Sequence, residues 1–411
     1  MMKKITSLLI VIMLCFGLAG CGSSDDGKGT DGESADAGTL TFWAYEPQSI
    51  ADKEAYQELI KEFSEKSGIT VKVSFIPKDS FNTKLNSAIA NGKQPDISYL
   101  DQPQIAEYVQ DEILLEITDI FDGGLKKEDF FSSALETNCI DGKYYGVPLN
   151  ITTSVLLYNK DMVSESDLPK DWAGWVELCK GIAENPTKAA FEGIGTGGYC
   201  SWYFQAFLNS AGGSLTNEAQ DKITFDDEKG MIAGKLIKQL YEYSPLEVRN
   251  STSSFGNGNV AFKLGGGSDI DSLEANFPTL NFGAAAIPPY ESGGISYSNI
   301  GGENLVVYAQ SSNQKDAKRL VEFLSQEENA AKVAKYTGNF SALKNIADTE
   351  NPKKQVVLKQ LETAVARPQL SGWITVNDSY LATAIENIIN GDDIEKNLET
   401  AAKQAEALIF N

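Results

Sequence analysis

Aromatic and acidic residues stand close together at two places in the first quarter of the chain. Trp43 and Tyr45 come just before Glu46, and Tyr99 lies two residues before Asp101. A sugar offers C–H faces that pack on aromatic rings and hydroxyl groups that donate to carboxylates, so a carbohydrate site needs both kinds of group together. These residues therefore make carbohydrate binding a candidate function, against the alternative that each ring simply packs in the core.

Several other chemistries are excluded or left without a specific signal. The chain has no histidine, which rules out Ser-His-Asp and Cys-His nucleophile systems and zinc sites with histidine ligands. Gly193–Gly198 matches the GxGxxG pattern of dinucleotide sites, but the apolar strand expected before it is weak, so we interpret it as a tight surface loop. Cys139, Cys179 and Cys200 show no metal-ligand spacing and are expected to be small buried residues, with one disulfide left open. We expect no metal and no cofactor.

The segments that lead into the aromatic and acidic groups are predicted to be strands. Leu40–Tyr45, Ile69–Phe75 and Asp96–Leu100 are apolar or alternating. Ser49 can cap the first of the two helices between them, and these helices end at Gly68 and Gly92. Strands that alternate with helices imply a mostly parallel sheet, which binds ligands at the loops leaving the carboxyl ends of its strands. The loops that follow the first and third strands are therefore the first places to expect a ligand.

The stretch Gly146–Asp161 is extended in character. Pro148 excludes a helix interior, and residues 151–157 are rich in β-branched and apolar side chains. Strands and helices alternate again after it, with one helix predicted from about Trp202 to Ser210. From about Lys315 onward the chain is predicted to be nearly all helical, including a helix from Asn377 to Asn390. We interpret Gly146–Asp161 as the crossing from one α/β lobe to another, with an ordinary buried strand as the alternative.

The N-terminal residues have the pattern of an export signal. Lys3 and Lys4 precede the largely apolar run Ile5–Leu18, which is too short for a comfortable membrane span. Leu18-Ala-Gly-Cys21 resembles a bacterial lipoprotein processing box, in which the chain is cut before a cysteine that carries acyl chains. Residues 22–38 are mostly Gly, Ser, Asp and Glu, as in a flexible tether. We expect Cys21 to anchor the protein at a membrane without a spanning helix.

Length and charge narrow the remaining possibilities. A chain of 411 residues with 42% hydrophobic content can bury a large core, and its length favours two or more domains. The net charge of −22 argues against binding nucleic acid or anionic lipid, because phosphate groups are bound by Lys and Arg.

Short segments spread over the chain form an ordered set, although each is weak by itself. They include Gly92-Lys-Gln-Pro-Asp96, Gly146-Val-Pro148, Leu156-Leu-Tyr-Asn-Lys-Asp161, Phe255-Gly-Asn-Gly-Asn-Val-Ala261, Gly301-Gly302 and Arg367-Pro-Gln-Leu-Ser-Gly-Trp373. Together, behind a lipoprotein signal, they resemble family 1 extracellular solute-binding proteins of ABC transporters, the group that contains maltose- and oligosaccharide-binding proteins. The resemblance covers essentially all of residues 39–411.

The resemblance implies an α/β protein with two lobes, a hinge of crossing strands and a ligand cleft between the lobes. The implied division is a signal peptide over 1–20, a tether over 21–38, a first lobe of 39–150 plus 299–340, and a second lobe of 151–298 plus 341–411. Lobe closure around a ligand would then be a hinge motion.

The resemblance also implies which residues meet the ligand. Trp43 and Glu46 match the loop after the first strand, Asp101 matches a carboxylate position, and Trp202 and Trp373 match stacking positions. Thr152 stands where related proteins carry an acidic contact, which puts that contact in doubt. The implied ligand-binding set is Trp43, Tyr45, Glu46, Asp101, Thr152, Trp202, Gly302, Glu303 and Trp373.

The leading hypothesis is a non-catalytic, membrane-anchored monomer that captures a carbohydrate, most specifically an oligosaccharide, and delivers it to ABC permease subunits. One alternative keeps the fold and changes the ligand to a polyamine, a phosphate ester or another small solute. The absence of Arg beside the inferred site residues disfavours an anionic ligand. Another alternative is a secreted glycosidase with paired carboxylates, because 57 acidic residues supply such pairs at many spacings.

Overall fold

The computed structural model describes residues 38–47, 49–249, 251, 253–347 and 349–410. The signal segment, the acylation site Cys21 and nearly all of the tether lie outside these residues, so those expectations stay predictions. Within them, no helix combines the length and apolar character needed to cross a bilayer. Cys139, Cys179 and Cys200 are free thiols, and burial raises the pKa of Cys179 and Cys200 to about 12, which keeps these two neutral.

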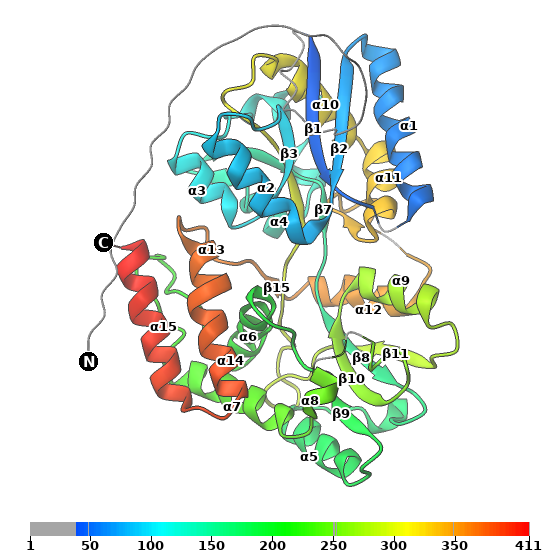
Figure 1. The fold of residues 1–411 in the computed structure, drawn as a ribbon, viewed down its shortest axis with the longest axis vertical. Coiled ribbons are helices and arrows are strands. Elements are labelled where there is room, and N and C mark those ends of the chain that lie inside the picture. The colour runs from blue at the N-terminus through cyan, green and yellow to red at the C-terminus, as the bar shows by residue number, and fades with distance from the viewer. Residues whose placement is uncertain (1–37, 48, 250, 252, 348, 411) are drawn as a thin grey trace, which may run out of the picture. The chain divides into compact units, whose positions relative to one another are not determined.

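Five strands form the first sheet, in the order β2-β1-β3-β13-β6 (Figure 1). The three strands predicted from the sequence are confirmed to within one residue at each end and pair in parallel, as expected. β13 runs antiparallel to both of its neighbours. The carboxyl ends of β1 and β3 therefore lie at the same edge as the start of β13. The bounds are Thr39–Tyr45 (β1), Thr70–Ile76 (β2), Ile97–Asp101 (β3), Gly146–Pro148 (β6) and Glu303–Val307 (β13).

The helices that accompany this sheet come from both ends of the sequence. α1 starts where the sequence predicts, because Ser49 Oγ accepts a hydrogen bond from the Asp52 N–H at 3.0 Å. It ends at Gly68, whose φ of 74° closes the helix in the left-handed region. α11 packs against α1, although about 270 residues separate them in the sequence. The bounds are Ile50–Ser67 (α1), Lys78–Ala90 (α2), Gln104–Gln110 (α3), Ser132–Glu136 (α4), Gln314–Ser325 (α10) and Glu327–Thr337 (α11).

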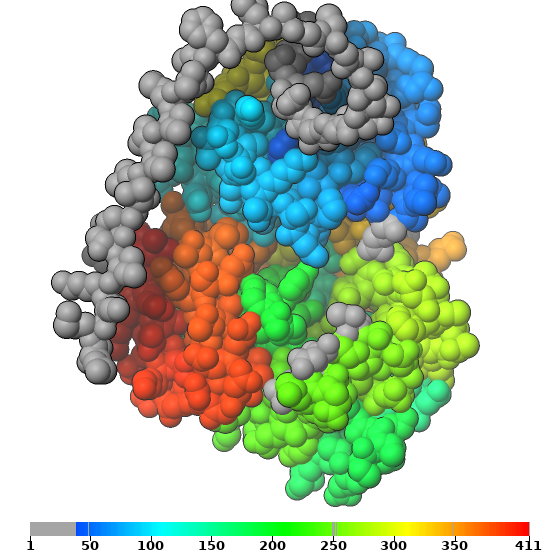
Figure 2. Space-filling model, in the orientation of Figure 1, coloured from blue at the N-terminus to red at the C-terminus, as the bar shows by residue number. Residues whose placement is uncertain are grey.

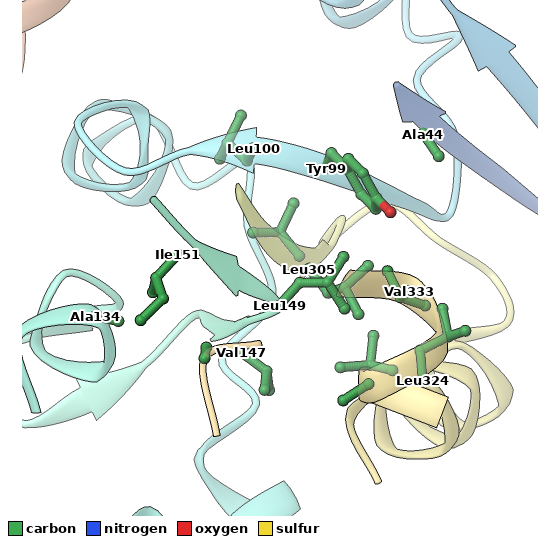
Figure 3. Close-up of a cluster of buried hydrophobic side chains, with 14 of the residues drawn as sticks. Ala44, Tyr99, Leu100, Ala134, Val147, Leu149, Ile151, Leu305, Leu324 and Val333 are labelled. Atoms are coloured by element: carbon green, nitrogen blue, oxygen red, sulfur yellow. The ribbon is translucent and has the colours of Figure 1, made fainter. Parts of the chain in front are cut away.

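The core beside the first sheet is built from strands and helices that are distant in sequence. Figure 3 shows Tyr99 and Leu100 of β3 together with Leu305 of β13, Leu324 of α10 and Val333 of α11. Each of these side chains is at most 1% exposed. Burying an apolar side chain of this size contributes about 1.5–3 kcal/mol, so the cluster fixes β3 and β13 side by side.

The second sheet has the order β11-β8-β10-β9 and shares no strand with the first. β8 runs antiparallel to β10 and β11, while β9 is parallel to β10, so this sheet is mixed. Its strands are Val155–Asn159 (β8), Ala189–Phe191 (β9), Val260–Gly265 (β10) and Phe282–Ala285 (β11). The helices around it are Trp172–Ala183 (α5), Gly198–Ser210 (α6), Glu228–Tyr241 (α7), Leu246–Arg249 (α8), Gly267–Asn276 (α9) and Pro352–Leu361 (α12).

The C-terminal helices complete this half of the molecule. α13 (Trp373–Thr375) runs through a π-helical turn, η4 (Val376–Leu381), into α14 (Ala382–Ile389), and α15 (Ile394–Ile409) packs beside them. The helix predicted from Asn377 to Asn390 is thus present, but its first turn is π-helical, with hydrogen bonds that span five residues instead of four.

The stretch Gly146–Asp161 crosses between the sheets, as the sequence predicts. β6 lies in the first sheet, β7 (Asn150–Ile151) pairs with β14 (Phe340–Ser341), and β8 lies in the second sheet. The ordinary buried strand offered as the alternative is therefore not what the structure contains.

A second crossing lies against the first. β12 (Ser298–Asn299) pairs with β15 (Ala364–Val365), and the Thr152 N–H donates to the Gly301 carbonyl oxygen at 2.9 Å. The Phe131 N–H donates to the carbonyl oxygen of Ala342, and the Lys344 N–H donates to that of Asp129. These two bonds hold residues 342–344 against residues 129–131 of the predicted first lobe. They favour placing the last passage of the chain into the second lobe after residue 344, rather than at residue 341 as predicted. The lobe limits themselves stay predictions.

Candidate ligand-binding site

Three predicted site residues meet at one edge of the first sheet. Tyr45 ends β1, Asp101 ends β3, and Glu303 opens β13 directly opposite Asp101 in the ladder. The Tyr45 ring meets Phe81 and Tyr99 edge-on, with centroid separations of 4.7 and 5.5 Å. The sheet thus places one aromatic ring beside two carboxylates, which is the combination predicted from the sequence.

Each of these two carboxylates is held by a cation. Arg367 donates to both oxygens of Asp101, at 2.9 Å from Nη1 and 2.5 Å from Nη2, and its side chain is only 9% exposed. Lys78 Nζ lies 3.4 Å from Glu303 Oε1, and this carboxylate raises the pKa of Lys78 to about 12. The expectation that no arginine stands beside the site is therefore wrong. Arg367 is far from Asp101 in the sequence and reaches it only through the fold.

Aromatic rings and lysines also meet at this edge. Lys78 Nζ lies 5.4 Å from the centre of the Tyr45 ring, and Lys84 Nζ lies 4.8 Å from the centre of the half-buried Trp43 ring. Burial and the charges of Glu303 and Asp101 raise the pKa of Tyr45 well above its usual value. Tyr45 is therefore a neutral hydroxyl that can donate or accept a hydrogen bond.

Sequence reasoning missed Tyr199, which stands in the first turn of α6. It is 59% exposed, and its phenol helps to raise the pKa of both Tyr45 and Lys78, so it lies near the first-sheet edge. In Figure 2 the bright green segment that includes α6 lies directly below the cyan segment that includes α2. The prediction that this helix begins near Trp202 hid the residue, because α6 begins at Gly198. The positive φ of Gly197 was the local signal that only the structure reveals.

Trp202 follows Tyr199 by about one helical turn and lies beside the second crossing. Its ring is half-buried and meets Tyr203 edge-on at 5.3 Å. A Cβ atom at Gly301 would lie 3.5 Å from this ring, an ordinary contact, and 3.2 Å from Thr152 Cγ2. Thr152 is half-buried and its backbone pairs with Gly301.

Gly302 has a φ of 135°, and a Cβ atom there would collide with the Asn150 carbonyl oxygen. Gly302 is needed for the packing of the crossings.

Two of the implied ligand-binding residues are not with this group. Trp373 is fully buried and belongs to the core around α6, α7 and α14, so the expectation that it stacks on a ligand is not met in this structure. The sequence places Trp373 ahead of the last helices, where a ring could stay partly exposed, but the structure buries it within this core. Glu46 is exposed and forms an ion pair with Lys53 of α1 at 2.7 Å.

Two further carboxylates face the same region from the second half of the chain. Asp378 of η4 lies against Gly198, and burial raises its pKa while Asn377 and Arg367 lower it. Asp269 accepts a hydrogen bond from the Gly266 N–H at 2.8 Å, and its charge helps to raise the pKa of Tyr203. Among the described residues, no group of three or more acidic or thiol side chains is placed to hold a metal ion.

The arrangement is suited to binding polar ligands. Rings from both halves of the molecule, Tyr45 and Trp43 on one side and Tyr199 and Trp202 on the other, flank carboxylates and cations. Asp101 and Glu303 are each neutralised by a cation, so the pair carries no net charge with its partners.

Comparison with known proteins decides the family. The family model for bacterial extracellular solute-binding proteins matches residues 58–360, well over half of the chain. The chain belongs to this family.

Two relatives show how far this solute-binding protein has diverged. The galactooligosaccharide-binding protein of Bacillus subtilis (strain 168) is 24% identical over 368 residues, covering 85% of this chain and 82% of the relative. The diacetylchitobiose binding protein DasA of Streptomyces coelicolor is 26% identical over 428 residues, covering 99% of this chain and 97% of the relative.

A solved structure confirms the fold of this solute-binding protein. UgpB from Mycobacterium tuberculosis, determined in complex with glycerophosphocholine, matches it with a TM-score of 0.78 and 22% identity. The match covers 90% of this chain and 98% of UgpB. The two-lobe α/β fold with crossing strands predicted from the sequence is therefore confirmed.

Proposed function

We propose that this chain is the substrate-binding lipoprotein of a bacterial ABC importer and that its ligand is a carbohydrate, specifically an oligosaccharide. The observation that carries the proposal is the edge of the first sheet, where the Tyr45 ring lies at the end of β1 beside the charge-balanced pairs of Asp101 and Glu303. Tyr199, from the other half of the molecule, contributes to the raised pKa of Tyr45. Rings supply faces for sugar C–H groups, and the paired ions supply donors and acceptors for hydroxyls.

The relatives point to the same class of ligand. Both are named for binding short sugar chains, and each aligns over most of its own length with this chain. Closure of the two lobes would bring the rings of Tyr199 and Trp202 toward Trp43 and Tyr45, so that contacts with sugar drive the motion.

The location and partners complete the proposal. Acyl chains on Cys21 would hold the protein on the extracytoplasmic side of the cell membrane, and a tether over residues 22–38 would let it reach permease subunits. It would act as a monomer and bind no nucleic acid. Labelling cells with a radioactive fatty acid should mark the wild-type chain and leave Cys21→Ser unmarked; a marked C21S chain would contradict the anchor.

A calorimetric titration of the chain without residues 1–20 against a panel of mono- and oligosaccharides tests the ligand class. We expect saturable heat with at least one oligosaccharide and a change in tryptophan fluorescence through Trp43 and Trp202. The absence of heat and of a melting shift with the whole panel would overturn the carbohydrate assignment.

The same incubations test whether the protein is a binding protein rather than a glycosidase. The cations bond both oxygens of Asp101 and one oxygen of Glu303, and a glycosidase would need such carboxylate oxygens to act on a glycosidic bond. We expect the bound oligosaccharide to be recovered intact after long incubation. Shorter products in amounts that exceed the protein would show catalysis.

A small anionic solute, such as a phosphodiester, is a second candidate because Arg367, Lys78 and Lys84 all lie in the site. The same fold holds glycerophosphocholine in UgpB. Titration with glycerophosphocholine separates the candidates, since its phosphodiester group would have to displace Asp101 or Glu303 from its cation, and this charged contact would weaken with salt even though the choline group leaves the molecule without net charge.

A further inference from the structure

A second concave site lies next to the candidate site and includes none of the implied ligand-binding residues. It is a cavity of about 720 Å³. Its walls come from both halves of the molecule: Ser49 and Asp52 at the start of α1, Tyr336 at the end of α11, and Ser272 and Asn276 on α9. A volume of this order is within the range of about 300–1,000 Å³ that is usual for small-molecule sites.

The lining of this cavity favours an uncharged, hydroxyl-rich group. Its acidic side chains, Asp52 and Asp271, are balanced by Lys335 and Lys354, and Asp271 and Lys354 are paired at 2.5 Å. Hydroxyl and amide groups occupy most of the remaining polar positions, and Tyr336 offers a half-buried ring. An ionic ligand would meet a charge of its own sign on one wall or the other, whereas a sugar unit would find both donors and acceptors.

Hydrogen bonds join the cavity to the candidate site. Asn339, which lines the cavity, donates from Nδ2 to Asn150 Oδ1 at 3.2 Å, and the same oxygen accepts from the Glu303 N–H at 3.4 Å. Asn150 is 1% exposed, and its Nδ2 has no hydrogen-bond partner. A buried donor left without a partner at this junction is costly unless a ligand or a water satisfies it.

Glycines keep the second half of the chain close to the junction. A Cβ atom at Gly266 would lie 2.8 Å from the Thr153 carbonyl oxygen, and one at Gly267 would lie 3.2 Å from the Gly338 carbonyl oxygen. The backbone before α9 therefore packs directly on the first crossing and on the end of α11.

We propose that the cavity is a subsite for one end of an oligosaccharide whose other units occupy the candidate site. The inference rests on the carbohydrate function proposed above and adds that the protein selects for ligand length. A disaccharide would fill the candidate site alone, and longer chains would gain contacts with Tyr336, Asn276 and Ser272. Binding a longer sugar chain costs more conformational entropy, and this cost is offset only if these contacts form.

Leucines that narrow the cavity from both walls test the proposal. Ala275 of α9 and Ala331 of α11 line the cavity and are exposed, so A275L with A331L should fold normally. Leucine fills space without offering a ring on which a sugar could stack. A matched control is Ala173→Leu with Ala407→Leu, two exposed helical positions that do not line the cavity.

Calorimetry with a homologous series from disaccharide to hexasaccharide gives the readout. For the wild type and the control we expect affinity to rise with length, and for A275L/A331L we expect disaccharide affinity within about twofold but a loss of about tenfold or more for the longest ligands. Equal length dependence in both double variants, at equal melting temperatures, would overturn the subsite. A wild type that binds no member of any sugar series would overturn the carbohydrate function, and this inference with it.

Discussion

The two sides of the candidate site are built in different ways. On the first-sheet side, Tyr45, Asp101 and Glu303 stand at strand ends, where backbone ladders fix their spacing. On the opposite side, Tyr199 and Trp202 stand in the first turns of a helix whose start is set by a glycine loop, and Tyr199 is largely exposed. The first side is a rigid arrangement of charges, and the second presents rings that a ligand has to order.

Replacing Trp373 should have the largest effect on stability and shows which aromatic residues belong to the ligand side. Because Trp373 is fully buried, Trp373→Ala should lower the free energy of unfolding by about 3–5 kcal/mol. Trp202 is half-buried, so Trp202→Ala should lower the free energy of unfolding less than Trp373→Ala does, and should lower the affinity for sugar more. Denaturant titration and calorimetry of both variants measure the contrast. Loss of affinity in a folded W373A chain, with W202A unaffected, would reverse these assignments.

Removing Arg367 should weaken the rigid side next most strongly. Arg367→Ala leaves the partly buried Asp101 without its bidentate partner, and we expect a loss of about 2–3 kcal/mol in the free energy of unfolding. Arg319→Ala is the control, because its ion pair with Asp316 is exposed on both sides and should be worth less than about 1 kcal/mol. Equal melting temperatures for R367A and R319A would show that the ion pair between Arg367 and Asp101 adds no more to stability than an exposed pair does.

Changing Tyr199 tests the side that the ligand orders. Tyr199→Ala should lower oligosaccharide affinity by about tenfold, since one stacked ring is worth about 1 kcal/mol or slightly more, and should leave the melting temperature unchanged. Tyr199→Phe keeps the ring and should retain most of the affinity. A Y199F chain as weak as Y199A would mean that the hydroxyl, rather than the ring face, makes the contact.

The smallest expected effect comes from the cation over Trp43. Lys84→Ala removes a contact between an ammonium group and a ring at an exposed position, worth about 0.5–1 kcal/mol. Lys93→Ala, an exposed lysine just after α2, is the control. The fluorescence of the sugar-free protein should change in K84A and not in K93A. An identical spectrum for all three chains would place Lys84 away from the ring in solution.

The strand-based parts of the fold could be predicted from the sequence because their signals are local. Alternation located β1 and β2, a short segment between helical and loop signals located β3, and the Ser49 cap and Gly68 bounded α1. The crossing at Gly146–Asp161 could be predicted because an extended segment lies between two regions in which strands and helices alternate. Tyr45 and Asp101 could be placed together because parallel strands end at one edge of a sheet.

The parts of the site that come from distant segments could not be predicted in this way. Arg367 reaches Asp101 across 266 residues, and no local pattern announces the pair. Trp373 carried a family match but no signal of burial, because the core that buries it is assembled from helices that are distant in the sequence. Tyr199 was missed for a smaller reason, an error of four residues in the start of α6.

The position of β13 has a consequence for how the chain is made. This strand lies between β3 and β6 in the first sheet, yet its last residue is Val307. A chain emerging from the ribosome therefore cannot close that sheet until roughly three quarters of the protein has been synthesised, and pairing across such long sequence separations is slow. For the exported lipoprotein proposed above, this delay would keep the polypeptide unfolded, and so able to pass through a secretion channel, until it meets the secretion machinery.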